Sequence, residues 1–265
     1  MYGILSTANT TTFAIMLLTT TVNGKEVRFD TQNGHELTIP VKEGPDTVNG
    51  FHIADAVIEP FKAGGFVGST AMGGACNCEN ITFNAHGNGT HTECLGHISK
   101  ERVALHQCLK EFLFMAELVT VQPEPAPNND FIITAELLKK VVKGNHPALL
   151  IRTLPNDGGK LTRRYSGTNP VYLAKEAALW IRERGVKHLL VDMPSVDREE
   201  DGGELLAHHA FWNYPENPRM DCTITEFIYA DNSIADGEYL LNISVGAFDS
   251  DASPSRVMVY ALTHA

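Results

Sequence analysis

Apolar and polar positions in the second half of the chain follow a spacing that predicts a helix and then a strand. Thr134 is the expected N-cap of a helix whose apolar positions recur with helical spacing, and Gly144 is its expected end. The apolar run at 148–151 follows and has the length of a buried strand. This unit therefore predicts a helix packed against a β core.

A second unit repeats this order. Asn169 is expected to cap a helix, with Pro170 at its first position and Gly185 at its end. The run at 186–193 then predicts another strand. The alternation of helices and strands indicates an α/β fold.

Both ends of the chain are rich in strand-like runs. Asn23 and Gly24, between two β-prone runs, predict a hairpin with a two-residue turn, and NITF at 80–83 predicts a further strand. Near the C-terminus, two strand-like runs at 237–248 and 255–262 flank a polar turn. β-strands are therefore expected at both ends of the chain.

No repeat or long linker interrupts the sequence, so we predict one domain over residues 1–265 whose first part, 1–80, is β-rich. The predicted class is α/β, with a mixed β core and packed helices. The apolar run at 13–18 is too short to span a bilayer, and no basic segment precedes it. We interpret it as part of a strand, and a cleaved signal segment is the alternative.

Composition and charge narrow the classes of function. The chain has 265 residues, of which 43% are hydrophobic and 20% charged, as in ordinary folded proteins. Its formal net charge of -11 repels phosphate backbones and anionic lipid, so we expect neither a nucleic-acid nor a membrane partner. The 5 cysteines lack C-x-x-C spacing, which argues against a disulfide framework and a zinc ribbon. A cytoplasmic location is therefore expected.

Three histidines and a carboxylate gather in the segment HGNGTHTECLGH. They are His86, His91, Glu93 and His97. In extended backbone His91 and Glu93 point to the same side of the strand. Converging imidazole and carboxylate groups suit divalent ions such as zinc or manganese, and glycines let the backbone turn tightly around an ion. Such histidines can also be simply solvated, but three with a carboxylate in so short a segment favour a metal site.

A second polar cluster, VDMPSVDREEDGGELLAHHAFW, begins where a predicted strand ends. Ligands of open α/β sheets bind at the carboxyl ends of the strands, so Asp192, Ser195 and Asp197 are candidates to shape a site. His208 and His209 follow them. Neighbouring helical residues point about a quarter of a turn apart, so we expect one of the two histidines to face an ion.

The order of these motifs resembles the cyclase family, whose best-known members are bacterial kynurenine formamidases. The resemblance extends from about residue 80 to the C-terminus. It is carried by HGNGTHTECLGH, against the family signature H-x-G-T-H-x-D-x-P-x-H, and by the segments D-x-P-S-x-D and D-A-S-P. It implies the swivelling β/β/α fold, a homo-oligomer such as a dimer or tetramer, and hydrolysis of a small-molecule amide with N-formyl-L-kynurenine as the reference substrate.

The resemblance also implies roles for single residues. His91 matches a metal-binding histidine, and Glu93 stands where the family has an aspartate that bridges two ions. The carboxylate is thus kept but extended by one methylene. His97 matches the residue that transfers a proton. The cofactor implied is one or two divalent ions, zinc first and manganese second.

The second ion is expected on His208, with His209 as its rival, and on Glu226. Strict register with the signature places Gly87 where the family has its first ligand. Either a one-residue bulge brings His86 into that place, or the first ligand is lost. The chain is therefore expected to be a divergent member of the family.

The chemistry expected of such a site is hydrolysis. A divalent ion lowers the pKa of bound water from 15.7 to about 7, and the resulting hydroxide attacks an amide carbonyl while His97 protonates the leaving nitrogen. Alternatives are a cyclic amide or an ester as substrate, or a metal-dependent small-molecule binding protein without turnover. A thiol enzyme built on Cys94 is a further alternative, but Cys94 would point to the opposite face from Glu93.

Overall fold

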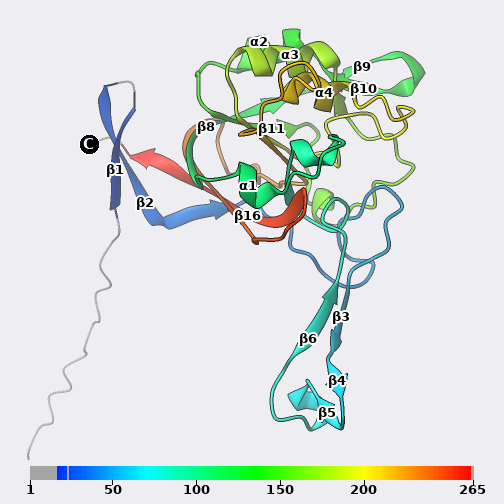
Figure 1. Ribbon diagram of the computed structural model, residues 1–265. Coiled ribbons are helices and arrows are strands. Elements are labelled where there is room, and N and C mark those ends of the chain that lie inside the picture. The colour runs from blue at the N-terminus through cyan, green and yellow to red at the C-terminus, as the bar shows by residue number, and fades with distance from the viewer. Residues whose placement is uncertain (1–16, 23, 264–265) are drawn as a thin grey trace, which may run out of the picture.

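The computed structural model describes residues 17–22 and 24–263, and its centre is a nine-stranded sheet that closes on itself (Figure 1). Strand β16 (Ala252–Thr263) pairs with both β15 (Gly237–Val245) and β7 (His91–Cys94), so seven strands form a closed barrel. The other barrel strands are β8 (Leu113–Val121), β11 (Ala148–Thr153), β13 (His188–Val191) and β14 (Thr223–Glu226). The predicted mixed β core with packed helices is confirmed.

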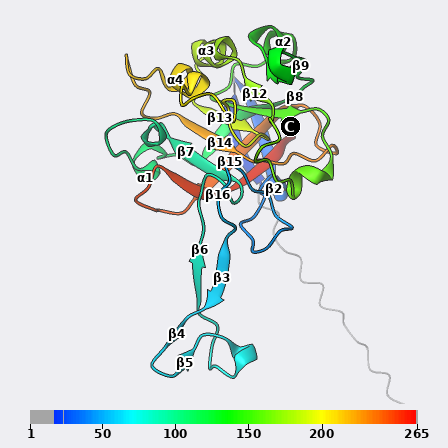
Figure 2. The ribbon, with the colours of Figure 1, turned by 90° about the vertical axis from the view of Figure 1, so that its right-hand side faces the viewer.

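The parallel strands of the barrel are buried on both faces, which explains why their sequences are continuously apolar. β11 pairs in parallel with β8 and β13. Leu149 and Ile151 of β11 pack toward the helices, whereas Leu150 belongs to a second apolar cluster with the side chains of β8 and β15. Three of the helices lie together over one outer face of the barrel (Figure 2). They are α2 (Ala135–Val141), α3 (Lys175–Glu183) and α4 (Leu206–Trp212).

The cap predicted for the first helix is confirmed, because the side chain of Thr134 accepts a hydrogen bond from the backbone of Leu137. The helix ends at Val141, before the predicted stop at Gly144. Both backbone N–H groups at 143 and 144 donate instead to the carboxylate of Glu117, which holds them outside the helix.

The start predicted for the second helix is wrong. Asn169 and Pro170 precede β12 (Tyr172–Leu173), and α3 begins only at Lys175. The reason is tertiary: β12 pairs with β10 (Phe131–Ile133), and the Asn169 amide donates to a carboxylate on the neighbouring loop. Gly185 ends α3 as predicted, with a positive φ of 78°.

The predicted N-terminal hairpin is confirmed. β1 (Leu17–Val22) and β2 (Lys25–Glu36) are antiparallel, with Val22 opposite Lys25 across the two-residue turn. β2 continues the sheet beyond β16. The first residues of the apolar run at 13–18 lie outside the described residues.

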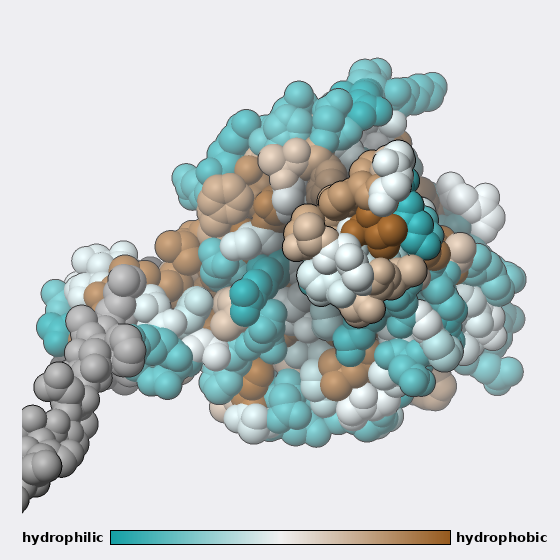
Figure 3. Space-filling model, turned by 90° about the horizontal axis from the view of Figure 1, so that it is seen from below, coloured by the Kyte–Doolittle hydropathy of each residue, from teal (hydrophilic) through white to brown (hydrophobic). Residues whose placement is uncertain are grey.

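An arm formed by residues 55–83 extends from the barrel (Figures 1 and 2). Its main hairpin pairs β3 (Val57–Pro60) with β6 (Glu79–Thr82), which confirms the strand predicted at 80–83. Beyond it lie β4 (Lys62–Ala63), β5 (Phe66–Val67) and the 3-10 helix η1 (Thr70–Met72). Apolar residues gather at the end of the arm, which points toward the viewer in Figure 3. The exposed apolar side chains of the arm are Val57, Phe61, Phe66, Met72 and Ile81.

Short elements complete the described chain. They are η2 (Leu95–His97), α1 (Leu105–Cys108), β9 (Glu124–Pro125), η3 (Pro127–Asn129) and η4 (Gly158–Leu161). Over the described ranges, no helix has the length and apolar character needed to cross a membrane.

Candidate metal centre

Strand pairing places three of the predicted residues on one face of the barrel wall. His91 and Glu93 lie two residues apart on β7, and Glu226 of β14 is directly opposite His91. All three side chains are buried. His91 Nε2 lies 3.3 Å from Glu226 Oε2. The side chain of Thr92, between the two residues of β7, points to the opposite face of that strand and forms a hydrogen bond with the hydroxyl of Thr225. The side chains of this strand therefore alternate between its two faces, as predicted.

The first turn of α4 brings His208, and not His209, to this face. His208 Nε2 lies 3.1 Å from Glu93 Oε1. The ring of His209 is turned aside, with Nδ1 3.0 Å from the backbone oxygen of Tyr214. Adjacent residues on a helix diverge in this way, so His208, and not His209, lies beside the other candidate ligands.

His86 reaches the same carboxylate from the loop before β7, where residues 84–88 form a tight turn. His86 Nδ1 lies 3.1 Å from Glu93 Oε2. Gly87, at the strict register position, packs against Ile53, and a Cβ there would come within 2.6 Å of the Ile53 Cδ1 atom. The position that the family signature gives to a histidine therefore has no room for a side chain, and the histidine is supplied one residue earlier.

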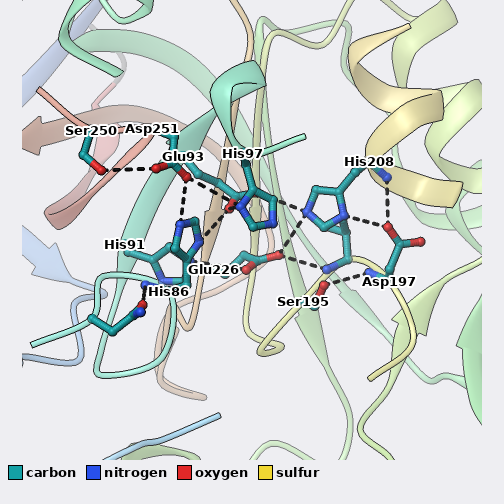
Figure 4. A network of polar contacts seen from close by, with 12 residues as sticks. His86, His91, Glu93, His97, Ser195, Asp197, His208, Glu226, Ser250 and Asp251 are labelled. Carbon is teal, nitrogen blue, oxygen red and sulfur yellow. Dashed lines mark hydrogen bonds and ion pairs between the residues drawn. The ribbon is translucent and has the colours of Figure 1, made fainter. Parts of the chain in front are cut away.

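His97 closes the open side of the cluster from η2, directly after β7. Its Nδ1 atom lies 3.7 Å from Glu93 Oε2 and 3.6 Å from Asp251 Oδ2. The His97 side chain is 29% exposed, whereas that of His91 is fully buried. Figure 4 shows the four histidines arranged around Glu93 and Glu226. The structure thus brings together all six residues predicted from the sequence.

Each of three histidines has one ring nitrogen bound to a further acceptor. His208 Nδ1 lies 2.6 Å from Asp197 Oδ2, His91 Nδ1 lies 3.1 Å from the backbone oxygen of Gly89, and His86 Nε2 lies 2.9 Å from Asp251 Oδ2. In every case the other ring nitrogen faces Glu93 or Glu226. This arrangement is typical of metal-binding histidines, in which an outer acceptor fixes the ring and its tautomer. The outer acceptors for the three rings are Asp197, Gly89 and Asp251.

The other candidates from the second cluster have different roles. Asp197 does shape the site, because it also accepts the backbone N–H groups of Ala207 and His208. Ser195 Oγ accepts the backbone N–H of Asp197. Asp192 takes no part, because its carboxylate bonds instead to Lys160 and to the residue at the end of β11.

The carboxylates give the cluster a strongly negative potential. Burial alone would lower the pKa of His86, but its contacts with Asp251 and Glu93 outweigh burial and raise the pKa to about 10. His208 behaves alike: burial opposes the charged form, yet Asp197 and Glu93 raise its pKa to about 10. Burial would raise the pKa of Glu93, but the charge of His97 and the contacts of His208 and His86 lower it well below its usual range. The same potential attracts a metal cation.

Two buried atoms of the cluster make no hydrogen bond, namely His91 Nε2 and Glu93 Oε2. Possible partners lie near, at 3.3 and 3.1 Å, but the geometry of these contacts is not that of a hydrogen bond. Buried polar atoms normally have a hydrogen-bond partner. A nitrogen and an oxygen that lack one and converge on the same place fit the ligands of a metal ion.

Glu93 belongs to two candidate groups of metal ligands. Their donor atoms lie within 4.8 Å of one another: His86, Glu93 and His97 in one, and His91, Glu93 and Glu226 in the other. Imidazole nitrogens with carboxylate oxygens suit zinc and also manganese. The residues therefore fit a divalent cation, and Glu93 is placed to serve both groups.

Asp251 also lies at this site, although it was not among the site residues predicted from the sequence. It lies in the turn predicted between the two C-terminal strands, far along the chain from the histidines. Pairing of Ala252 with Glu93 across β16 and β7 brings it to the cluster. The D-A-S-P segment was the only sequence signal for it.

Comparisons with known proteins show which proteins this chain is similar to. A family model described as "Putative cyclase" matches residues 18–198. The kynurenine formamidase of Bacillus thuringiensis (strain Al Hakam) is 28% identical over 188 residues, which cover 70% of this chain and 81% of that protein. A predicted metal-dependent hydrolase from Bacillus stearothermophilus has a TM-score of 0.61 at 15% identity, covering 86% of this chain and 98% of that chain. Isatin hydrolase A from Labrenzia aggregata has a TM-score of 0.61 at 17% identity, covering 86% and 93%. The two solved structures establish likeness of fold.

Proposed function

This chain belongs to the cyclase family, and from that membership we propose that it is a metal-dependent hydrolase of an amide carbon–nitrogen bond, resembling arylformamidase. The observation that carries the proposal is the buried carboxylate of Glu93, which faces imidazole nitrogens of His86 and His208 at 3.1 Å. The name of the 28% identical relative, a kynurenine formamidase, supports the reaction class.

The ligands that we propose are His86, His91, Glu93, His208 and Glu226. One or two divalent ions held there, zinc or manganese, would supply a Lewis acid for the carbonyl oxygen and a water that loses its proton near neutral pH. Glu93 is proposed to bridge, because it lies in both groups of donor atoms.

His97 is the proposed proton carrier. Its Nδ1 atom faces the carboxylates of Glu93 and Asp251, which favour a proton on that nitrogen. Nε2 is then the atom that exchanges a proton with the leaving nitrogen of the amide. The partial exposure of the ring suits this role, because the carrier must contact substrate. The same nearness to Glu93 makes His97 a rival ligand, and its substitution distinguishes the two roles.

An aryl formamide such as N-formyl-L-kynurenine is the proposed substrate. A hollow of about 330 Å³ borders His86 and contains Phe83 and Phe248. The two rings meet edge to face with centroids 6.2 Å apart. Phe248 is exposed and Phe83 is half-buried, and such rings beside a polar centre can pack against an aryl group. A cyclic amide is the second candidate, favoured by the fold likeness to isatin hydrolase A, and an ester is the third.

Turnover on three substrates tests the proposal: N-formyl-L-kynurenine, isatin and a phenyl ester. We expect the formamide to be hydrolysed fastest, with release of formate. Glu93→Gln removes the central charge at constant size and is expected to abolish turnover, whereas Glu136→Gln, on the exposed side of α2, is its control. Binding of these compounds without any turnover would contradict the proposal that the chain is a hydrolase and would favour a small-molecule binding protein.

We further propose a cytoplasmic homo-oligomer, a dimer or tetramer, with neither nucleic acid nor membrane as partner. The arm supports self-association, because a two-stranded hairpin with exposed apolar residues has little stability alone in water. Light scattering after size exclusion is expected to give two or four chains per particle. Phe66→Ser together with Met72→Ser on the arm is expected to reduce that number, and a monomer in the unmodified protein would contradict the proposal.

A further inference from the structure

Asp251 faces His86 from the side opposite to Glu93. Its Oδ2 atom accepts a hydrogen bond from His86 Nε2 at 2.9 Å, while His86 Nδ1 lies 3.1 Å from Glu93 Oε2. The imidazole is thus held between two carboxylates, one buried and one 31% exposed. Figure 4 shows the contacts of the His86 ring with Asp251 and with Glu93 as dashed lines.

The backbone around Asp251 is fixed to β7 and to the start of α1. Its carbonyl oxygen accepts the backbone N–H of Cys94 at 3.0 Å, and that of Ser250 accepts the N–H of Leu105 at 2.8 Å. The other carboxylate oxygen of Asp251 accepts the hydroxyl of Ser250. Asp251 is therefore tied to the same strand that carries Glu93, so the distance between the two carboxylates is set by sheet pairing.

His86 differs from the other two histidines in the nitrogen that it presents. His91 and His208 are held at Nδ1 and face the carboxylates with Nε2. His86 is held at Nε2 and faces Glu93 with Nδ1. Since Gly87 has no room for a side chain, the histidine enters the site from one residue earlier and with its ring reversed.

We propose that Asp251 is a positioning residue for metal binding, which holds the proton of His86 on Nε2 and so leaves the Nδ1 lone pair to the ion. This inference rests on the proposed metal-dependent function. An acceptor on the outer nitrogen selects the tautomer and the ring orientation of a metal-binding histidine. Asp251 thereby makes His86 a ligand in spite of its displaced position in the sequence.

The test is the zinc affinity of the full chain, measured by competition with a chelating indicator. Loss of an outer acceptor typically weakens metal binding 10- to 100-fold, so Asp251→Ala is expected to weaken one site by about that factor. Asp251→Asn keeps an oxygen that can accept the Nε2 proton and is expected to restore most of the affinity. Asp249→Ala removes a carboxylate of the same loop that is exposed and pairs with Arg102, and it is expected to change nothing.

A double-mutant cycle shows whether Asp251 acts through His86. We expect His86→Ala and Asp251→Ala to weaken zinc binding to a similar extent and the double variant to be no weaker than His86→Ala alone. Additive losses would overturn the inference. Unchanged affinity in Asp251→Ala with reduced turnover would overturn it too, because Asp251 would then serve His97, whose Nδ1 atom lies 3.6 Å away.

A spectroscopic measurement on the unmodified protein tests the same inference and does not depend on whether the Asp251 variants fold. In nitrogen-15 spectra of the zinc-loaded chain, we expect one histidine bound through Nδ1 with its proton on Nε2, and that signal to be missing in His86→Ala. Binding of His86 through Nε2 would overturn the inference alone. A chain that binds no zinc would overturn the proposed function as well, which separates the two failures.

Discussion

His188 lies buried at the start of β13. Because of this residue, we predict that the free energy of unfolding of the chain falls measurably in mild acid. The residue is 4% exposed, its Nδ1 atom lies 2.9 Å from Thr223 Oγ1, and its ring packs against that of Phe114 at a tilt of 35°, with centroids 3.9 Å apart. Burial, with the nearby charge of Lys187, lowers its pKa from 6.5 to about 4. The folded chain therefore resists protonation of His188, whereas the unfolded chain accepts it.

The sign and size follow from linkage. A histidine pKa that is lower in the folded state contributes stability above about pH 6.5, and this contribution is lost as the pH falls toward 4. A pKa difference of this size is worth roughly 3 kcal/mol in full. Between pH 7.5 and pH 5.0 the linkage relation gives a loss of about 2 kcal/mol from this residue.

Urea unfolding of the metal-free chain at the two pH values measures this loss. Metal-free protein is needed because ion release in acid would add its own pH dependence. His188→Asn retains a partner for Thr223 but does not titrate, so the unmodified chain is expected to lose about 2 kcal/mol more than this variant. His35→Asn, on the exposed side of β2, is the control. Equal pH dependence in the unmodified chain and His188→Asn would refute the reasoning.

Three further predictions concern other side chains. His91→Ala should lose both the metal and turnover, whereas His97→Ala should keep the metal and lower turnover by roughly 100- to 10,000-fold; metal loss in His97→Ala would make His97 a ligand. Lys160→Met, which leaves a buried carboxylate unpaired, should cost about 3 to 5 kcal/mol in urea unfolding, whereas Lys187→Ala, from an exposed pair, should cost less than about 1 kcal/mol. Cys94→Ala should retain turnover, because contact with a neighbouring cysteine and burial raise the pKa of this thiol and so disfavour the reactive thiolate. A folded but inactive variant would instead support a thiol enzyme.

Local signals in the sequence predicted those elements whose ends are set locally. The cap at Thr134 and the stop at Gly185 each depend on side chains or φ angles within a few residues. The start predicted at Asn169 failed because a strand pairing with a distant segment takes up the residues after Pro170. Closure of the barrel also depends on pairing between β16 and β7, which no local pattern encodes.

The candidate site divides in the same way. His91 and Glu93 were predictable because strand periodicity alone places them on one face. Glu226 needed the resemblance, since its position opposite His91 depends on the register of two strands far apart in sequence. The sequence alone does not show whether His86 reaches the site, because that depends on the tight turn formed by residues 84–88. Asp251 was missed because its role exists only after β16 has paired with β7.

Metal content and turnover measured in the same samples test the central claim most directly. The purified chain is analysed for metal per chain before and after dialysis against a chelator, and each sample is assayed with N-formyl-L-kynurenine. We predict one or two ions per chain, loss of turnover together with the metal, and recovery of both when zinc is returned. Turnover that persists after the metal has been removed, or a purified chain that neither holds nor takes up a divalent ion, would contradict the account.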